Sequence, residues 1–224
     1  MKKYVIIVAG GNGTRMNNAI PKQFIELKGK PILMHTFEKF AAAIPEINHV
    51  LVLSSSYLEQ WKMLCEKYNF TIPYQLAEAG ETRFHSVKNG LALIPENCIV
   101  GVHDAARPLV SITTIIDAFK IAEQKGNASP AISLNESIRE VKGDSNKAVD
   151  RNNYFIIQTP QCFQSDLLKN AFLQEYNPLF TDDASVLEAI GEKINLIEGN
   201  RENIKITTPL DLIIAETLVR SGAI

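Results

Sequence analysis

The sequence is poor in cysteine, with three residues of this type in a chain of 224. Cys65, Cys98 and Cys162 are odd in number and far apart, and no CxxC pair occurs. The pattern therefore indicates neither a disulfide framework nor a cysteine zinc site. The four histidines also lack the spacing of zinc ligands. We expect three reduced cysteines that pack inside the fold, as in proteins of a reducing compartment.

Long apolar runs and an excess of charge are missing as well. The apolar run at residues 4–9 is too short for the core of a signal peptide, and no segment approaches the roughly 18 apolar residues of a membrane span. The 23 Lys and Arg residues against 25 Asp and Glu residues give a net charge of −2, which argues against binding of nucleic acid by bulk charge. The composition thus predicts a cytoplasmic protein that binds neither membrane nor nucleic acid.

Short apolar runs alternate with longer amphipathic stretches along the chain, the pattern of strands joined by crossover helices. Strands are predicted at residues 4–9, 49–53, 99–103, 128–134, 155–158 and 193–197. Helical spacing predicts three helices that lie on the sheet, with the apolar faces Tyr57, Leu58, Trp61, Leu64, Cys65 and Tyr68; Ile112, Ile115, Ile116 and Phe119; and Leu210, Ile213, Ile214 and Leu218. The sequence predicts an α/β fold, a Rossmann-like and mainly parallel sheet with helices on both faces, in one domain over residues 1–224.

Residues 135–152 interrupt this alternation. Two extended segments, residues 137–141 and 148–151, flank a polar turn that contains Gly143, which predicts a β-hairpin projecting from the body. An isolated two-stranded ribbon is marginally stable in water, so a partner surface is needed to support it. We therefore predict that this hairpin is a dimerisation arm and that the protein is a homodimer.

A glycine-rich segment follows the first predicted strand, with Gly10, Gly11 and Gly13 ahead of Arg15 and, further on, Lys22. Glycines allow backbone N–H groups to approach a phosphate, and the two cations add positive charge at the same edge of the sheet. The segment fits neither the P-loop, which has Lys then Ser or Thr after its last glycine, nor the dinucleotide fingerprint. The alternative is an ordinary glycine-rich turn between a strand and a helix.

Further polar groups follow other predicted strands. Asp104 comes directly after the strand at residues 99–103, where an α/β protein places a carboxylate for Mg²⁺, although an Asp here can also cap a helix. Residues 80–86 join a strand-like run to a helix and bring small polar groups to the same crevice, or form a surface turn. Arg151, Thr159, Thr181 and Lys205 stand at element ends, and each alone is a weak signal.

Together these motifs resemble the 2-C-methyl-D-erythritol 4-phosphate cytidylyltransferases of the non-mevalonate isoprenoid pathway. The resemblance runs in order over nearly the whole chain. It is carried by Gly11-Asn12-Gly13-Thr14-Arg15-Met16, Pro21-Lys22-Gln23, His103-Asp104-Ala105-Ala106-Arg107-Pro108, Val149-Asp150-Arg151-Asn152, Thr159-Pro160-Gln161, Thr181-Asp182 and Asn203-Ile204-Lys205. Gly10 stands where many members have Ala, and Ser137 where many have Thr.

The resemblance implies a reaction and a role for each matching residue. An oxygen of methylerythritol phosphate would attack the α-phosphorus of CTP, giving 4-diphosphocytidyl-2-C-methyl-D-erythritol and pyrophosphate. Catalysis would fall to Arg15, Lys22 and Lys205. The nucleotide would be bound by Ala9, Gly10, Gly11, Gly13, Gly80, Ser86, Asp104 and Ala105, with Asp104 also holding Mg²⁺ or another divalent cation. The sugar-alcohol phosphate would be bound by Arg107, Ser137, Arg151, Thr159 and Thr181, with Ser137 and Arg151 coming from a partner's hairpin.

Two alternatives remain open on the sequence. A ribitol 5-phosphate cytidylyltransferase shares the glycine loop, the metal site and the hairpin, although the alanines between Asp104 and Arg107 favour methylerythritol phosphate. A non-catalytic nucleotide sensor could keep the same fold. The presence of Arg15, Lys22, Asp104 and Lys205 argues against that alternative.

Overall fold

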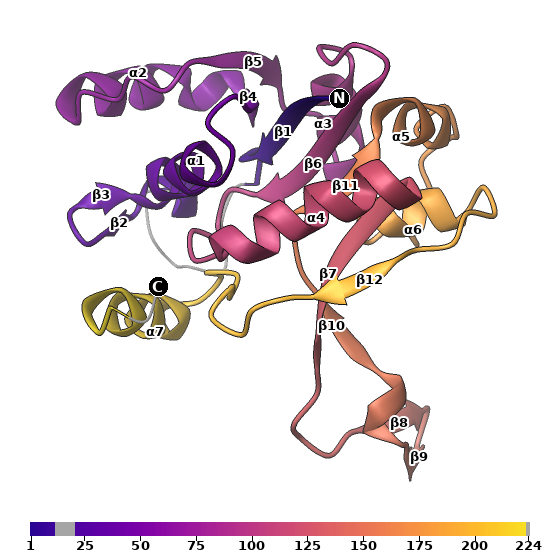
Figure 1. Cartoon of the computed structure of the whole chain (residues 1–224). Helices are drawn as coiled ribbons and strands as arrows, with labels where there is room; N and C mark the ends of the chain where they lie inside the picture. The colour runs from indigo at the N-terminus through magenta and orange to yellow at the C-terminus, as the bar shows by residue number, and fades with distance from the viewer. Residues whose placement is uncertain (12–20, 223–224) are drawn as a thin grey trace.

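A computed structural model describes residues 1–11 and 21–222. In this part of the chain the main sheet has eight strands, in the order β10, β7, β11, β6, β1, β4 and β5, with β12 also paired to β7. Their bounds are β1 Lys2–Val8, β4 Asn48–Leu53, β5 Tyr74–Glu78, β6 Cys98–Asp104, β7 Asn127–Ser133, β10 Phe155–Ile157, β11 Gln161–Gln164 and β12 Leu196–Glu198. Figure 1 shows this sheet between two layers of helices.

The central strands are parallel and buried on both faces. Strand β1 pairs in parallel with β4 and β6, and β4 pairs in parallel with β5. Strand β11 is the exception, because it runs antiparallel between β6 and β7. Its beginning, and not its end, therefore lies at the edge where β1 and β6 finish. This reversal brings residues 158–161 to the same edge as Asp104.

Alternate side chains of the sheet enter two separate cores, as the two-residue period of a strand requires. Val5 and Ile7 of β1 face one core, which is covered by α1 (Ile32–Ala43), α2 (Leu58–Lys67) and α4 (Ile112–Lys125). Tyr4 and Ile6 face the other core, which is covered by α3 (Arg83–Leu91), α5 (Ser165–Ala171) and α6 (Asp183–Glu188). The sheet with helices on both faces confirms the predicted fold class.

A third, smaller cluster lies beside the sheet. Here α7 (Pro209–Arg220) buries Ala215 together with Leu27 of the short pair β2 (Glu26–Leu27) and β3 (Lys30–Pro31). Ile206 is fully buried in the same cluster. The cluster anchors the segment that leads from the sheet to α7, and that segment contains Lys205.

Residues between β7 and β10 form the projecting hairpin (Figure 1). Strands β8 (Arg139–Lys142) and β9 (Ser145–Ala148) pair antiparallel around a turn at Gly143 and Asp144. The turn is shorter than the sequence predicted. No residue of the pair is buried, and Val141 is 68% exposed. We refer to residues 134–154 as the arm.

The six predicted strands are confirmed with shifts of one to three residues at their ends, and the strand-like run ahead of residue 80 is β5. Strand β11 was not predicted. Two predicted helix faces were wrong in part. In α4, Ile115 and Phe119 are buried while Ile112 and Ile116 are more than 40% exposed, because Ala118 and Ala122 complete the buried stripe. In α7, Leu210, Ile213 and Ile214 of the predicted face are more than 40% exposed. Leu218, the fourth residue of that face, packs in the third cluster with Ala215, Leu212 and Val219. Trp61 is buried, as predicted.

The helices in the described part of the chain are too short or too polar to span a membrane.

Candidate active site

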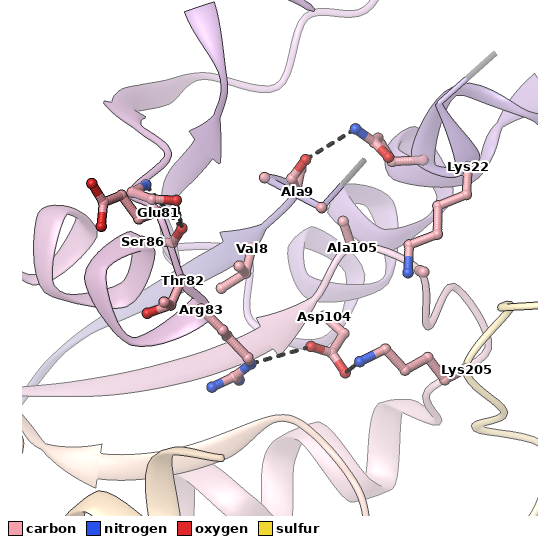
Figure 2. Close-up of a pocket in the computed structure, with 15 residues that line it drawn as sticks. Val8, Ala9, Lys22, Glu81, Thr82, Arg83, Ser86, Asp104, Ala105 and Lys205 are labelled. Carbon is pink, nitrogen blue, oxygen red and sulfur yellow. Dashed lines mark hydrogen bonds and ion pairs between the residues drawn. The ribbon is translucent and has the colours of Figure 1, made fainter. Parts of the chain in front are cut away.

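A pocket opens where β1 and β6 end, at the edge of the sheet that the sequence singled out. Ala105 N donates a hydrogen bond to Val8 O over 3.1 Å, so the ends of the two strands lie side by side. Two lysines reach this pocket, Lys22 from a short 3₁₀ helix (Lys22–Phe24) and Lys205 from the segment before α7. Figure 2 shows both lysine side chains on the same side as Asp104. The pocket is lined by Val8, Ala9, Gly10, Gly11, Lys22, Gln23, Gly80, Glu81, Thr82, Arg83, Ser86, Asp104, Ala105, Ala106 and Lys205.

Two backbone segments form one wall of the pocket by close contact. A Cβ atom at Gly80 would lie 2.4 Å from His85 Cβ, and a Cβ atom at Gly10 would lie 2.7 Å from Ala79 Cβ. Both positions therefore require glycine in this packing. Gly80 N donates to Ser86 Oγ over 3.0 Å, which closes the turn ahead of α3. The resulting wall exposes backbone groups and small side chains, which suits recognition of a flat, polar ligand edge.

Asp104 lies among three cations at the end of β6. Its Oδ2 is 2.9 Å from Lys205 Nζ and 3.3 Å from Arg107 Nε, and its Oδ1 is 3.7 Å from Arg83 Nε. Burial alone would raise the pKa of this carboxyl, but the positive charges of Arg83, Lys205 and Arg107 outweigh burial and hold the pKa well below its usual range. Asp104 is therefore ionised, and the site carries more positive than negative charge around it.

Hydrogen bonds within the protein fix the backbone at Asp104. His103 Nε2 lies 3.0 Å from Arg107 O, an acceptor, so Nε2 carries the proton and Nδ1 accepts one. The Thr159 hydroxyl donates to His103 Nδ1 over 3.0 Å and accepts from Asp104 N over 3.2 Å. Burial lowers the pKa of His103 to about 4, which keeps the ring neutral in this role. Thr159 thus fixes the end of β6, and its hydroxyl proton is donated to His103 and not to a ligand.

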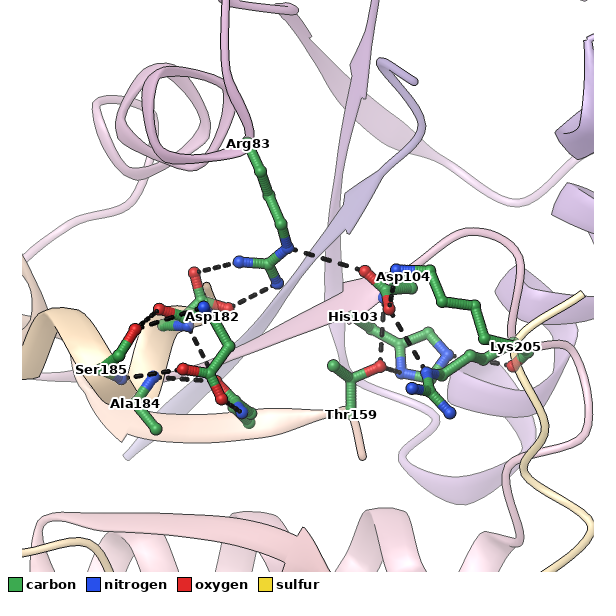
Figure 3. A network of polar contacts seen from close by, with 11 residues as sticks. Arg83, His103, Asp104, Thr159, Asp182, Ala184, Ser185 and Lys205 are labelled. Carbon is green, nitrogen blue, oxygen red and sulfur yellow. Dashed lines mark hydrogen bonds and ion pairs between the residues drawn. The ribbon is translucent and has the colours of Figure 1, made fainter. Parts of the chain in front are cut away.

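A second ion pair, which the sequence analysis did not predict, lies beside Asp104 (Figure 3). Arg83 donates to both carboxylate oxygens of Asp183, over 2.8 Å and 2.6 Å. Asp183 begins α6, and its backbone N donates to Gln161 Oε1 over 3.0 Å. Burial raises the pKa of the Asp183 carboxyl, and the ion pair with Arg83 opposes that rise. The pair joins the turn ahead of α3 to the start of α6.

The structure brings together most of the residues predicted to bind the nucleotide and two of the three predicted to be catalytic. Ala9, Gly10, Gly11, Lys22, Gly80, Ser86, Asp104, Ala105 and Lys205 all line the pocket. Gly13 and Arg15 lie outside the described residues. Arg107 and Thr159 lie behind Asp104 and contact it directly. Thr181 is exposed beside the start of α6, while Ser137 and Arg151 lie in the arm and do not line the pocket.

The sequence interpretation missed Arg83, Asp183 and Gln161 as parts of the site. Each stands within a segment that was singled out, at residues 80–86, 181–183 and 159–161. Nothing in the local pattern shows that these three segments meet, because contacts so far apart in sequence depend on how the elements are arranged. For Arg83 the sequence did offer one signal. It is a charged residue at the first position of a helix, next to a glycine turn, and that position favours a place in the site.

The fold and the site together define a class of protein. A mainly parallel α/β sheet whose strand ends carry glycine turns, two lysines and an ionised carboxylate is the architecture of a nucleotidyltransferase enzyme. The family model for 2-C-methyl-D-erythritol 4-phosphate cytidylyltransferase (IspD) matches residues 3–221. The chain belongs to this family.

Relatives and solved structures agree with this assignment over nearly the full length. The chain is 50% identical over 219 residues to the 2-C-methyl-D-erythritol 4-phosphate cytidylyltransferase of Phocaeicola vulgatus, covering 98% of this chain and 100% of the relative. It is 48% identical to the enzyme of the same name from Bacteroides thetaiotaomicron, with the same coverage. The crystal structure of the Anaerococcus prevotii 4-diphosphocytidyl-2C-methyl-D-erythritol synthase superposes with a TM-score of 0.83 at 25% identity, covering 98% and 96% of the two chains. The Francisella tularensis family member gives 0.79 at 34% identity, covering 97% and 99%.

Proposed function

We propose that this chain joins CTP and 2-C-methyl-D-erythritol 4-phosphate in a single displacement. A phosphate oxygen of the methylerythritol phosphate forms a bond to the α-phosphorus of CTP. The bond from that phosphorus to the pyrophosphate oxygen breaks, and pyrophosphate leaves with the electron pair. The observation that carries the proposal is the meeting of Lys22, Lys205 and Asp104 in one pocket with two glycine turns.

Each group then has a role that follows from its charge and position. The wall formed by Gly10, Gly80 and Ser86 binds the base through backbone and hydroxyl groups, with Ala9, Gly11, Gly13 and Ala105 as further nucleotide contacts. Lys22, together with Arg15 of the glycine loop, holds the triphosphate and neutralises the charge that grows on the leaving pyrophosphate. Lys205 acts on the α-phosphate. Because no covalent intermediate forms on the protein, catalysis comes from positioning and charge complementarity.

The pocket fits a divalent cation, Mg²⁺ in the first place. Asp104 supplies a hard carboxylate oxygen, whereas no cluster of three acidic, histidine or cysteine side chains suited to a metal occurs in residues 1–11 and 21–222. Such a donor set suits Mg²⁺, which binds through one or two carboxylates and completes its shell with phosphate oxygens and water. When bound, the ion would neutralise negative charge on the triphosphate and hold its oxygens in place. Asp104 and its three cations would orient the complex.

The second substrate is bound by Ser137 and Arg151, which come from the arm of a second chain. Thr181, Arg107 and Thr159 support this part of the site, the last two from behind Asp104. The exposure of the arm supports a homodimer, as do Tyr154, Phe155 and Ile156 at its base, each 46% exposed or more. The working unit is one domain over residues 1–224 with a dimerisation arm at about residues 135–152. The odd and distant cysteines, free in the structure, favour a cytoplasmic location.

Pyrophosphate release tests the proposal directly. With CTP and Mg²⁺, methylerythritol phosphate should give a kcat/KM at least about 100-fold above that of ribitol 5-phosphate, because a site built for one set of hydroxyls rejects another. The reverse preference would make the chain a ribitol phosphate cytidylyltransferase. If neither sugar-alcohol phosphate causes pyrophosphate release while CTP still binds, the chain is a nucleotide sensor.

A further inference from the structure

The ion pair of Arg83 and Asp183 is unusual in its burial. The Asp183 side chain is 1% exposed and that of Arg83 is 27% exposed. Taking such a pair out of water costs free energy that its mutual attraction seldom exceeds, so an apolar pair of similar size is often equally stable. Stability alone is therefore a weak reason for these two residues to be charged. Their place beside Asp104 offers a better one.

Arg83 is the cation on the Oδ1 side of the Asp104 carboxylate, at ion-pair distance and beyond hydrogen-bond distance. Lys205 and Arg107 both approach Oδ2, whereas Arg83 Nε is the cation that approaches Oδ1, at 3.7 Å. Within the described residues, removal of Arg83 would leave Oδ1 without an ion-pair partner, and the carboxylate could turn about its Cβ–Cγ bond. The guanidinium is itself held by both Asp183 oxygens. Burial would lower the pKa of Arg83, but Asp183 and Asp104 raise it, so its charge is permanent.

We propose that Arg83 is a positioning residue of the reaction, anchored by Asp183, which holds Asp104 in the orientation that receives the complex of CTP and divalent cation. The proposal rests on the role proposed above for Asp104 in binding that cation. It assigns Asp183 a task in the site although this carboxylate does not line the pocket. Arg83 acts through Asp104 and not by contact with the base.

The base-binding turn does not depend on the Arg83 side chain. Gly80 N is bonded to Ser86 Oγ over 3.0 Å, and the Thr82 hydroxyl caps α3 by accepting from His85 N over 3.4 Å. Thr82 also contacts His85 Nδ1 at 2.9 Å. A substitution at Arg83 should therefore leave the base wall intact, and its effect should appear in kcat and in the metal dependence of CTP binding more than in the affinity for CTP without metal.

The test is the double variant Arg83→Gln/Asp183→Asn in the full chain. It removes one positive and one negative charge, so the net charge near Asp104 is unchanged, and it leaves no buried ion without a partner. The matched control is Lys30→Gln/Glu38→Gln, which removes a 2.6 Å ion pair between β3 and α1, away from the pocket. Thermal midpoints, kcat, KM for CTP, and calorimetric binding of CTP with EDTA or with Mg²⁺ are measured for both.

We expect the double variant to lose about 10- to 100-fold in kcat, the usual effect of removing a group that orients a metal-binding carboxylate. Its affinity for CTP in EDTA should stay within about threefold, because the base wall is intact, and the gain in CTP affinity caused by Mg²⁺ should fall by about tenfold. The control should match the unchanged chain. If the double variant does not fold, Arg83→Lys takes its place, because one ammonium can pair with Asp183 but lacks the fork that also reaches Asp104.

Three results would overturn the proposal. Unchanged kcat in the double variant, or in a folded Arg83→Lys variant, would leave the pair a structural one. A loss of kcat with an unaltered Mg²⁺ effect would show that Arg83 acts on the nucleotide directly. A wild-type chain whose CTP affinity does not respond to Mg²⁺ would remove the proposed role of Asp104 and this inference with it, while pyrophosphate release would still report on the proposed reaction.

Discussion

Gly10 and Ala79 share a space that holds one methyl group and not two. A Cβ atom at position 10 would lie 2.7 Å from Ala79 Cβ, closer than carbon atoms pack. The glycine that departs from the Ala of many family members is thus explained by its neighbour across the pocket wall. The contact links the residue after β1 to the turn ahead of α3, and both segments bind the nucleotide in our proposal.

We predict that Gly10→Ala weakens CTP binding by about tenfold and lowers the thermal midpoint, since overpacking costs about 1 to 3 kcal/mol. Adding Ala79→Gly should restore most of both losses, because it frees the methyl site. Gly11→Ala is the control for stability, since a Cβ atom there meets nothing within 4 Å. Calorimetry with CTP and thermal unfolding give the two readouts. A double variant no better than Gly10→Ala would contradict the shared-space explanation.

His49 makes stability depend on pH from within the first core. Burial lowers the pKa of its ring from 6.5 to about 4, so the unfolded chain takes up a proton at a higher pH than the folded chain does. Stability from this group is therefore complete above pH 6.5 and is lost as the pH falls towards 4, by about 2 kcal/mol at pH 5. Denaturant unfolding at pH 7 and pH 5 should show a smaller drop for His49→Leu than for the unchanged chain. An equal drop in the two chains would place the pH dependence elsewhere.

At the scale of elements, Gln161 at the start of β11 caps α6. Its Oε1 accepts from the backbone N of Asp183 and Ala184 over 3.0 Å and 2.9 Å, and its Nε2 donates to Asp182 Oδ2 over 2.7 Å. Strand and helix are thus joined by one fully buried side chain. This cap is what keeps Asp183, and hence Arg83, in place.

We expect Gln161→Leu to destabilise the fold by about 2 to 4 kcal/mol, because it leaves two buried N–H groups and a carboxylate oxygen without their partner. Gln174→Leu is the control. Gln174 Nε2 donates hydrogen bonds to Ala171 O and to Val186 O, the second of which lies near the opposite end of α6, and the side chain accepts no backbone N–H group. Urea unfolding compares the two. Equal losses of unfolding free energy in the two variants would show that the cap at the start of α6 contributes no more than an ordinary buried amide.

The elements themselves were largely predictable, and their relations were not. Buried parallel strands such as β1 and β6 are recognised in the sequence by their many Val and Ile residues. Strand β5 has two adjacent exposed residues and β11 is polar at both ends, so neither shows this pattern. Helix periodicity located α4 and α7 but placed only part of each buried face correctly, because small residues such as Ala122 and Ala215 fill the tight contacts and several larger apolar residues remain exposed. The pocket followed from the rule on strand ends. The pair Arg83 and Asp183 did not, because it depends on β11 being antiparallel.

For the whole molecule, the arm predicts a site shared between two chains. Arg15→Ala and Arg151→Ala should each be nearly inactive as homodimers. In a mixed dimer, one site then carries both substitutions and the other carries neither, provided that Arg151 serves the site of the other chain. Random exchange makes about half of the dimers mixed, each with one intact site of two, so activity should recover to roughly a quarter of the wild-type value.

The measurement is pyrophosphate release before and after exchange, with mass-tagged chains to prove that exchange took place. Two variants of the same chain region, Arg151→Ala and Arg139→Ala, form the control mixture. If Arg139→Ala is active as a homodimer, the activity of that mixture should equal the average of its two components before and after exchange. Proven exchange without recovery in the Arg15 and Arg151 mixture would assign Arg151 to its own chain or to dimerisation alone.

Because the arm begins and ends at the same point of the sheet, its length does not affect the register of the strands in the body. Ser133 of β7 faces Phe155 of β10 across the last pair of the ladder, so residues 134–154 begin and end at one point of the sheet. A one-residue shift within a strand turns every side chain to the opposite face, but a residue gained or lost inside the arm shifts no strand of the body. The length of the arm can therefore change by single residues while the register of the sheet that carries the pocket stays the same.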